Sequence, residues 1–338
     1  MHKYILIATL SLLIGQIKAQ DKRPIIDILD SLQYTADMPK DILKTKSLVL
    51  VSVPPKSTSP YIRGNWQALA EEAQPGFSRA GLDAVVYYHV EDIYSGKESF
   101  DAFAENFNKR EIPNVIFLIR ENGINKIILT NMHDGATLVK AGQQAWKTEN
   151  KDLSVAMNNL YKAAGNASQA RENLLIPEVP EFGEMPRVIK ARRGEYYDLN
   201  FSSEKLAIPI FADTSKINLV MGNYPYKYGL VDPEMEEKKM RSEGYQYVLY
   251  FVHSTSKSVK EMLEYPIKES ETAYISEVIK DGESKVTSNN INTPVYKFYI
   301  KHIYSGNIFL GKRWDAAPKW EDALNNYIDN LKNELVRN

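Results

Sequence analysis

The stretch of this chain closest to a catalytic signature is a glycine and lysine motif near the carboxyl end. Residues 306–312 read Gly-Asn-Ile-Phe-Leu-Gly-Lys and match most of a phosphate-binding loop. Arg313 stands where such a loop needs a serine or threonine for magnesium, and the interior of the motif predicts an apolar strand instead of a flexible turn. We therefore interpret the match as accidental and keep nucleotide binding at Lys312 as an alternative.

A second group of possible catalytic residues follows an apolar stretch in the first half of the chain. Glu91 and Asp92 could hold a divalent cation such as magnesium or act as a general base, but a solvated strand end explains them without a function. His89 and His253 end two predicted strands, and no two histidines stand at helical or strand spacing. We therefore expect neither a zinc site nor a transition-metal site, and no cofactor apart from the magnesium alternative.

The amino terminus has the form of a secretory signal peptide. Residues 1–19 combine Lys3, a short apolar stretch and a closing Ala19, which predicts a mature chain that begins at Gln20 and is periplasmic or secreted. No later stretch approaches the roughly 20 apolar residues of a membrane helix, so we expect no membrane insertion. The chain has no cysteine, which excludes disulfides and thiol chemistry.

The overall composition indicates an ordinary globular protein with a nearly balanced charge. A formal net charge of −1 gives no electrostatic reason to expect nucleic acid or an anionic membrane as a partner. With 43% hydrophobic and 11% aromatic residues, the chain can bury two cores without disulfides. The expected partner is therefore a protein or a small ligand whose identity the composition does not give.

The chain repeats part of its own pattern at a fixed offset. Leu48 opens an apolar run and is followed sixteen positions later by Gly64, and Leu206 is followed at the same distance by Gly222. Further on, segment 113–119 shares a proline and two apolar positions with 294–300, and 156–159 is similar to 323–326. Repetition at this scale predicts two similar domains in tandem.

Hydrophobic periodicity, turn residues and proline positions give the order of elements in each predicted domain as strand, helix, strand, helix, strand, strand, helix. In the first domain, the expected helices begin at Asn65, near Ser95 and at Leu153, and the first of them ends near Pro75. The second domain also carries an inserted hairpin over 273–287. The predicted organisation is a leader with a short helix over 20–45, a first domain over 46–164, a proline-containing linker over 165–203 and a second domain over 204–338.

The segment from Ile112 to Gly123 resembles the part of thioredoxins in which an isoleucine and a cis-proline enter a strand that ends at a glycine turn. This resemblance implies an α/β fold of two tandem thioredoxin-like sandwich domains. The Cys-x-x-Cys motif of that family would stand at the start of the first helix, where this chain has Asn65-Trp66 and, in the repeat, Asn223-Tyr224. The resemblance therefore implies the fold without the thiol oxidoreductase activity.

In open α/β sheets, ligands bind beyond the carboxyl ends of the parallel strands, beside helix amino termini. This rule selects ten candidate ligand-binding residues, namely Asn65, Trp66, His89, Glu91, Asp92, Pro113, Asn223, Tyr224, His253 and Pro294. Each asparagine serves equally well as a helix cap and each aromatic residue as a core anchor. We predict a non-catalytic protein that binds a ligand or another protein. The alternatives are a divalent-cation-dependent nucleotide phosphohydrolase and a scaffold of a cell-envelope assembly.

Overall fold

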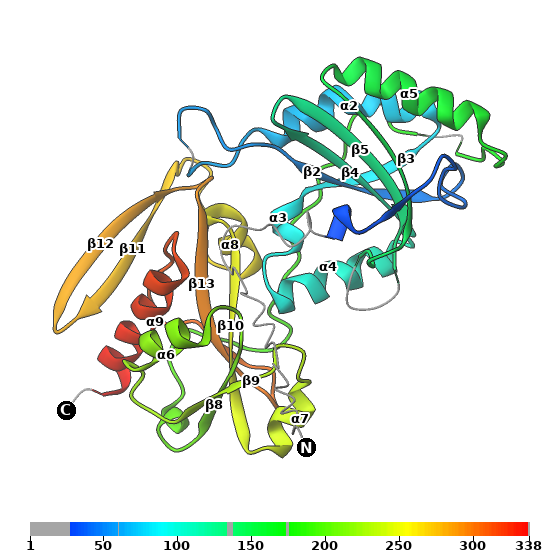
Figure 1. The fold of residues 1–338 in the computed structure, drawn as a ribbon. Coiled ribbons are helices and arrows are strands. Elements are labelled where there is room, and N and C mark those ends of the chain that lie inside the picture. Colours follow the sequence, from blue (N-terminus) through cyan, green and yellow to red (C-terminus); the bar gives the residue numbers. More distant parts are fainter. Residues whose placement is uncertain (1–27, 60, 134–137, 174–175, 337–338) are drawn as a thin grey trace, which may run out of the picture.

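The computed structural model describes residues 28–59, 61–133, 138–173 and 176–336, so the predicted signal peptide lies outside the described residues. The chain forms two α/β units, each built on a six-stranded mixed sheet (Figure 1). None of the described helices combines the length and the apolar character needed to cross a membrane.

The sheet of the first unit has the order β1-β6-β5-β4-β2-β3. Its strand β2 pairs in parallel with β3 and β4, and β5 is antiparallel to both β4 and β6. The strands are β1 (Gln33–Tyr34), β2 (Lys46–Ser52), β3 (Asp83–His89), β4 (Asn114–Glu121), β5 (Ile124–Asn131) and β6 (Gln144–Asn150). The helices are α2 (Trp66–Ala80), α3 (Val90–Ile93), α4 (Lys97–Lys109) and α5 (Leu153–Asn166).

The sheet of the second unit has the order β7-β14-β13-β10-β8-β9. Its strands are β7 (Arg193–Gly194), β8 (Lys205–Pro209), β9 (Tyr228–Val231), β10 (Tyr245–Thr255), β13 (Pro294–His302) and β14 (Ile308–Phe309). The helices are η1 (Leu199–Ser202), α6 (Thr214–Met221), α7 (Glu237–Ser242), α8 (Ser256–Met262) and α9 (Trp320–Leu335). The inserted hairpin is confirmed as β11 (Ala273–Lys280) and β12 (Glu283–Asn290), an antiparallel pair that projects beside α9 in Figure 1.

Both sheets place their strands in the same order when the strands are numbered along each unit. Each sheet begins with a two-residue edge strand, β1 or β7. When the other strands of the sheet are numbered along the chain, they follow in the order fifth, fourth, third, first and second. In each sheet the first strand is parallel to the second and third, the fourth is antiparallel to the third, and the edge strand is parallel to the fifth. Each unit is therefore a mixed α/β sandwich, as the sequence pattern predicts at this coarse level.

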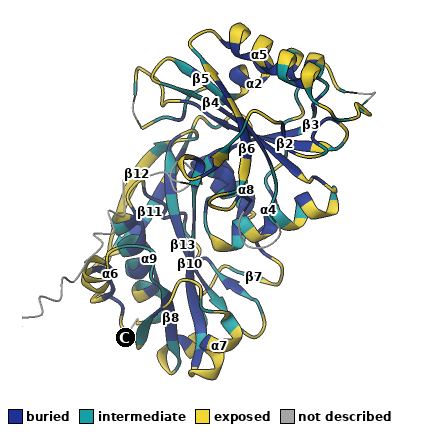
Figure 2. Cartoon of the chain, turned by 45° about the vertical axis from the view of Figure 1, so that its right-hand side comes forward, coloured by how far each residue is buried: buried dark blue, intermediate teal, exposed yellow. Residues whose placement is uncertain are grey.

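The helices cover the sheets on both faces, which explains why β2 is apolar from Leu48 to Val51. Leu48 and Leu50 point into the core that includes Phe103 of α4, whereas Val49 and Val51 point into the core under α2 and α5. Alternate residues of a strand face opposite sides, so a strand covered twice needs apolar residues at every position. Figure 2 shows the resulting buried layer through both units, and the apolar core that contains Leu48 continues into the second unit.

Two of the sequence correspondences between the units fall on elements that are not equivalent. Gly222 is the carboxyl-terminal cap of α6, whereas Gly64 precedes the amino-terminal cap of α2. Pro113 directly precedes β4, the third strand of its unit, whereas Pro294 opens β13, the fourth strand. These two correspondences are wrong, because similarities of a few residues also occur on elements that are not equivalent. The matches of Leu48 with 206 and of 156 with 323 fall on equivalent elements.

Other differences concern element ends and short elements. Helix α2 continues through Pro75 to Ala80 and ends at Gly81, which has the left-handed φ of 82° that glycine tolerates best. No cis peptide bond occurs among the described residues, so the bond before Pro113 is trans. The segment predicted as a linker pairs with both sheets, through the parallel bridge of Tyr87 with Phe182 and through strand β7.

Candidate functional site

Two adjoining cavities lie between the units, and Arg63 and Gly64 line both of them. We call the larger one, of about 780 Å³, the junction cleft and the smaller one, of about 190 Å³, the side pocket. The junction cleft is lined by Lys56, Arg63, Gly64, Asn65, Trp66, Gln67, Asp92, Phe182, Gly183, Glu184, Met185, Thr255, Lys257, Ser258, Glu261 and Asn292.

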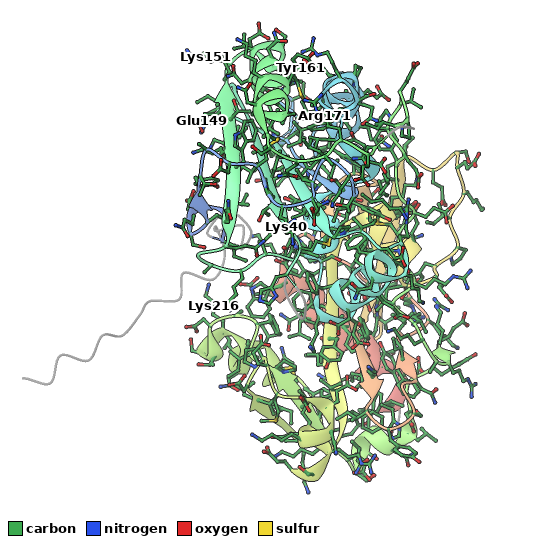
Figure 3. All side chains as sticks on the ribbon, turned by 90° about the vertical axis from the view of Figure 1, so that its right-hand side faces the viewer. Lys40, Glu149, Lys151, Tyr161, Arg171 and Lys216 are labelled. Atoms are coloured by element: carbon green, nitrogen blue, oxygen red, sulfur yellow. The ribbon has the colours of Figure 1, made fainter. Side chains whose placement is uncertain are left out.

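The cleft lies where the sheet rule predicts a site, beyond the carboxyl ends of β2 and β3. Its first wall is the loop between β2 and α2, the first turn of α2 and Asp92 of α3. Its second wall is formed by α8 and the turn between β12 and β13, and the connecting segment 182–185 closes one side. In Figure 3 the labelled Lys151 and Tyr161 lie on the first unit, and the labelled Lys216 lies on the second.

Arg63 is buried between the two cavities and holds a network that joins the units. Its Nη1 donates to both carboxylate oxygens of Asp92 at 2.9 and 3.0 Å, and its Nη2 donates to Glu91 Oε2 at 3.2 Å. The same Nη2 donates to Ser254 Oγ of β10 at 3.1 Å, and that hydroxyl donates to Asp92. The carboxylates predicted as cation ligands or bases therefore both pair with one guanidinium, which forms strong charged hydrogen bonds of this kind.

The two histidines predicted at strand ends both line the side pocket, together with Glu91 and Pro294. His89 accepts a hydrogen bond at Nδ1 from the backbone N–H of Glu91 at 3.3 Å. The ring of His253 stacks on Tyr296 at 3.8 Å, and its backbone N–H donates to Ser95 of the first unit. Burial, aided by the charge of Arg63, lowers the pKa of His253 to about 4, so this imidazole is neutral at pH 7.

An aromatic pair forms the apolar part of the junction cleft. Trp66, the first residue of α2, packs edge to face against Phe182 with 5.3 Å between ring centroids. Asn65 caps α2, since its Oδ1 accepts a hydrogen bond from the N–H of Ala68 at 3.2 Å. The capping role proposed as the plain explanation of Asn65 is confirmed, and the residue also lines the cleft.

Four of the residues singled out in the sequence lie outside both cavities. Pro113 lies at the opposite edge of its sheet, because β4 is parallel to β2 and begins where β2 begins. Tyr224 is buried in the core of the second unit, and Asn223 follows the carboxyl end of α6. Lys312 is exposed, with its Nζ 4.2 Å from the ring centroid of Tyr196, and strand β14 lies inside the motif 306–312.

The residues that join the two units were not predicted from the sequence. Arg63 and Ser254 are separated by 191 positions, so no local pattern connects them. The available signal was an arginine two residues before a helix cap, where the helix dipole disfavours positive charge unless carboxylates compensate it. No group of three or more potential metal ligands occurs among the described residues.

No family model, curated protein or solved structure matches this chain. The geometry of the cleft is therefore the basis for inferring a function. That geometry supplies charged groups, amides, hydroxyls and an aromatic surface from two units, and this is an arrangement suited to holding a polar molecule.

Proposed function

We propose that this protein binds a small polar ligand in the junction cleft without transforming it. The observation that carries the proposal is a cavity of about 780 Å³ whose walls come from both units. Small-ligand sites typically measure about 300–1,000 Å³ and often lie between domains. Most lining side chains are charged, amide or hydroxyl groups, which favours a ligand with many hydrogen-bonding groups over a lipid-like one.

The same geometry favours binding over catalysis. Glu91 and Asp92 are held by Arg63, and the ring of His253 is stacked on an aromatic neighbour. The phosphohydrolase alternative would require magnesium to displace Arg63 from these carboxylates, and Lys312 lies outside the cleft. A role as a scaffold stays a second proposal. It would be favoured by a protein partner that still binds when the cleft is blocked by a bulky substitution.

We also propose that the two units descend from one duplicated unit of thioredoxin-like type. The shared strand order supports the duplication, and the α/β alternation supports the resemblance. The position of Pro113 at the far sheet edge speaks against a thioredoxin-type site in the first unit. Export to the periplasm or out of the cell is likewise a proposal, and the composition of residues 1–19 supports it.

A thermal-shift screen against nucleotides, sugars, short peptides and metal ions tests the binding function. A ligand at 100 times its Kd stabilises the folded state by about 2.7 kcal/mol, which raises the melting temperature by several degrees. The wild type is compared with Gln67→Arg, which places a long side chain in the cleft without removing a buried group. Tyr304→Ala, at a side chain that is 75% exposed and outside both cavities, is the control.

The expected result is a stabilising ligand whose effect is lost in Gln67→Arg and kept in Tyr304→Ala. A ligand that stabilises the Gln67→Arg variant as strongly as the wild type would contradict binding in the cleft. Turnover of the bound ligand that disappears when Asp92 is replaced would contradict the absence of chemistry.

A further inference from the structure

The junction cleft carries unpaired charges of opposite sign on different walls. Lys56 belongs to the loop between β2 and α2, and Glu184 belongs to the connecting segment. Neither side chain forms an ion pair with another described residue. The charge of Arg63, in contrast, is already matched by two carboxylates. The cleft therefore offers one free ammonium and one free carboxylate to a ligand.

A second carboxylate strengthens the acidic side of the cleft. Glu261 of α8 pairs only loosely with Lys257, at 3.9 Å between Nζ and Oε1. Burial raises the pKa of Glu261, and the neighbouring charges of Asp92 and Glu184 raise it further against the opposing effect of Lys257. A positively charged group placed between Glu184 and Glu261 would relieve this repulsion.

The remaining lining residues match the chemistry of a peptide chain. Asn65, Gln67 and Asn292 each present both a carbonyl oxygen and an amide N–H₂, which complements the C=O and N–H groups of a peptide backbone. Trp66 and Phe182 give an apolar surface for a side chain. A neutral sugar would leave both unpaired charges unused, and a nucleotide would use Lys56 but leave Glu184 without a cation.

We propose that the ligand of the junction cleft is a short peptide with free termini, its amino group between Glu184 and Glu261 and its carboxylate at Lys56. This inference rests on the proposed binding function and specifies the ligand of the same site. Both terminal contacts are hydrogen bonds between charged groups, so each should contribute about tenfold to affinity.

Isothermal titration with four forms of one tripeptide, Ala-Phe-Ala, tests the proposal. The forms carry both free termini, an acetylated amino terminus, an amidated carboxyl terminus, or both caps. We expect the free form to bind most tightly and each cap to weaken binding about tenfold. Added salt should weaken the free form more than the doubly capped form, because it screens the terminal charges.

Two cleft variants assign each terminus to its wall. Glu184→Gln should weaken binding of the peptides with a free amino group and leave the acetylated forms unchanged. Lys56→Gln should weaken binding of the peptides with a free carboxylate and leave the amidated forms unchanged. Glu283→Gln and Lys285→Gln change the same residue types on the exposed strand β12, outside the cleft, and should bind like the wild type.

Equal affinities for the capped and free peptides would overturn the proposal, as would a failure of all four forms to bind. If a sugar or a nucleotide instead stabilises the wild type and loses its effect in Gln67→Arg, the cleft is a binding site and only the peptide assignment fails. If no ligand class binds in the cleft, the proposed function fails with it.

Discussion

Lys297 of β13 and Asp315 form an ion pair inside the second unit, with exposed side-chain fractions of 0% and 1%. The Lys297 Nζ donates to Asp315 Oδ1 at 2.7 Å and to the carbonyl oxygen of Leu310 at 2.9 Å. Burial lowers the pKa of Lys297 and raises that of Asp315, so desolvation pushes each group toward its neutral form. The attraction within the pair is therefore largely offset by the cost of removing two charges from water.

Replacing only Lys297 should be far more costly than replacing the pair. The Lys297→Met variant keeps most of the side-chain length but leaves the Asp315 carboxylate buried, with the amide of Asn330 still donating to it at 3.2 Å. Loss of one partner of a buried pair costs about 3–5 kcal/mol, a large part of the ~5–15 kcal/mol of a typical domain. The double variant with Asp315→Val leaves no buried charge and should recover at least about 2 kcal/mol of that loss.

Urea unfolding of the wild type, the single variant and the double variant measures these differences, followed in parallel by tryptophan fluorescence and circular dichroism. Coincidence of the two signals checks that one transition is being observed, which the free energy calculation requires. A single variant that loses less than about 1 kcal/mol would refute the reasoning, because a desolvated carboxylate without its cation must cost more. A double variant less stable than the single one would refute it as well.

Three further predictions concern the junction between the units. The pKa of His253 lies near 4 in the folded protein, below its ordinary value of 6.5, so its contribution to stability is complete above pH 6.5 and falls by up to about 3 kcal/mol toward pH 4. The His253→Gln variant should lose less stability between pH 6.5 and pH 4 than the wild type does. An unchanged slope of stability against pH would speak against this role of His253. Arg63→Ala removes the cation from a buried carboxylate and should cost about 3–5 kcal/mol in thermal unfolding, with Arg63→Lys between it and the wild type. Gly96→Ala would press a methyl group against the carbonyl oxygen of Phe251 and should cost about 1–3 kcal/mol, more than Gly123→Ala, where a methyl meets no atom within 4 Å.

The elements that the sequence predicts correctly are those whose local pattern is strong. Strand β2 is apolar at consecutive positions, and the turn at Asn122-Gly123 connects β4 and β5 as an antiparallel hairpin. The polar strand β6 and the short elements α6 and β9 escaped prediction. Exposed or short segments carry little hydrophobic periodicity, and partners distant in sequence stabilise them.

The candidate site was predictable only in part, for a similar reason. The sheet rule placed Trp66, His89 and Asp92 at one edge, and the structure does gather them around the two cavities. Pro113 was misplaced because the sequence does not give the direction of β4 relative to β2. Arg63 was overlooked because its partners come from two different units.

The α/β class of both units, the apolar faces that build their cores and the inserted hairpin follow from residue periodicity over a few turns or strands, so they can be predicted without coordinates. Strand order, the contact of β10 with the first unit and the existence of the junction cleft instead depend on how distant parts of the chain pack in three dimensions. A cavity between two units depends on how their surfaces meet, and this is set by contacts such as that of Arg63 with Ser254, which no local pattern encodes.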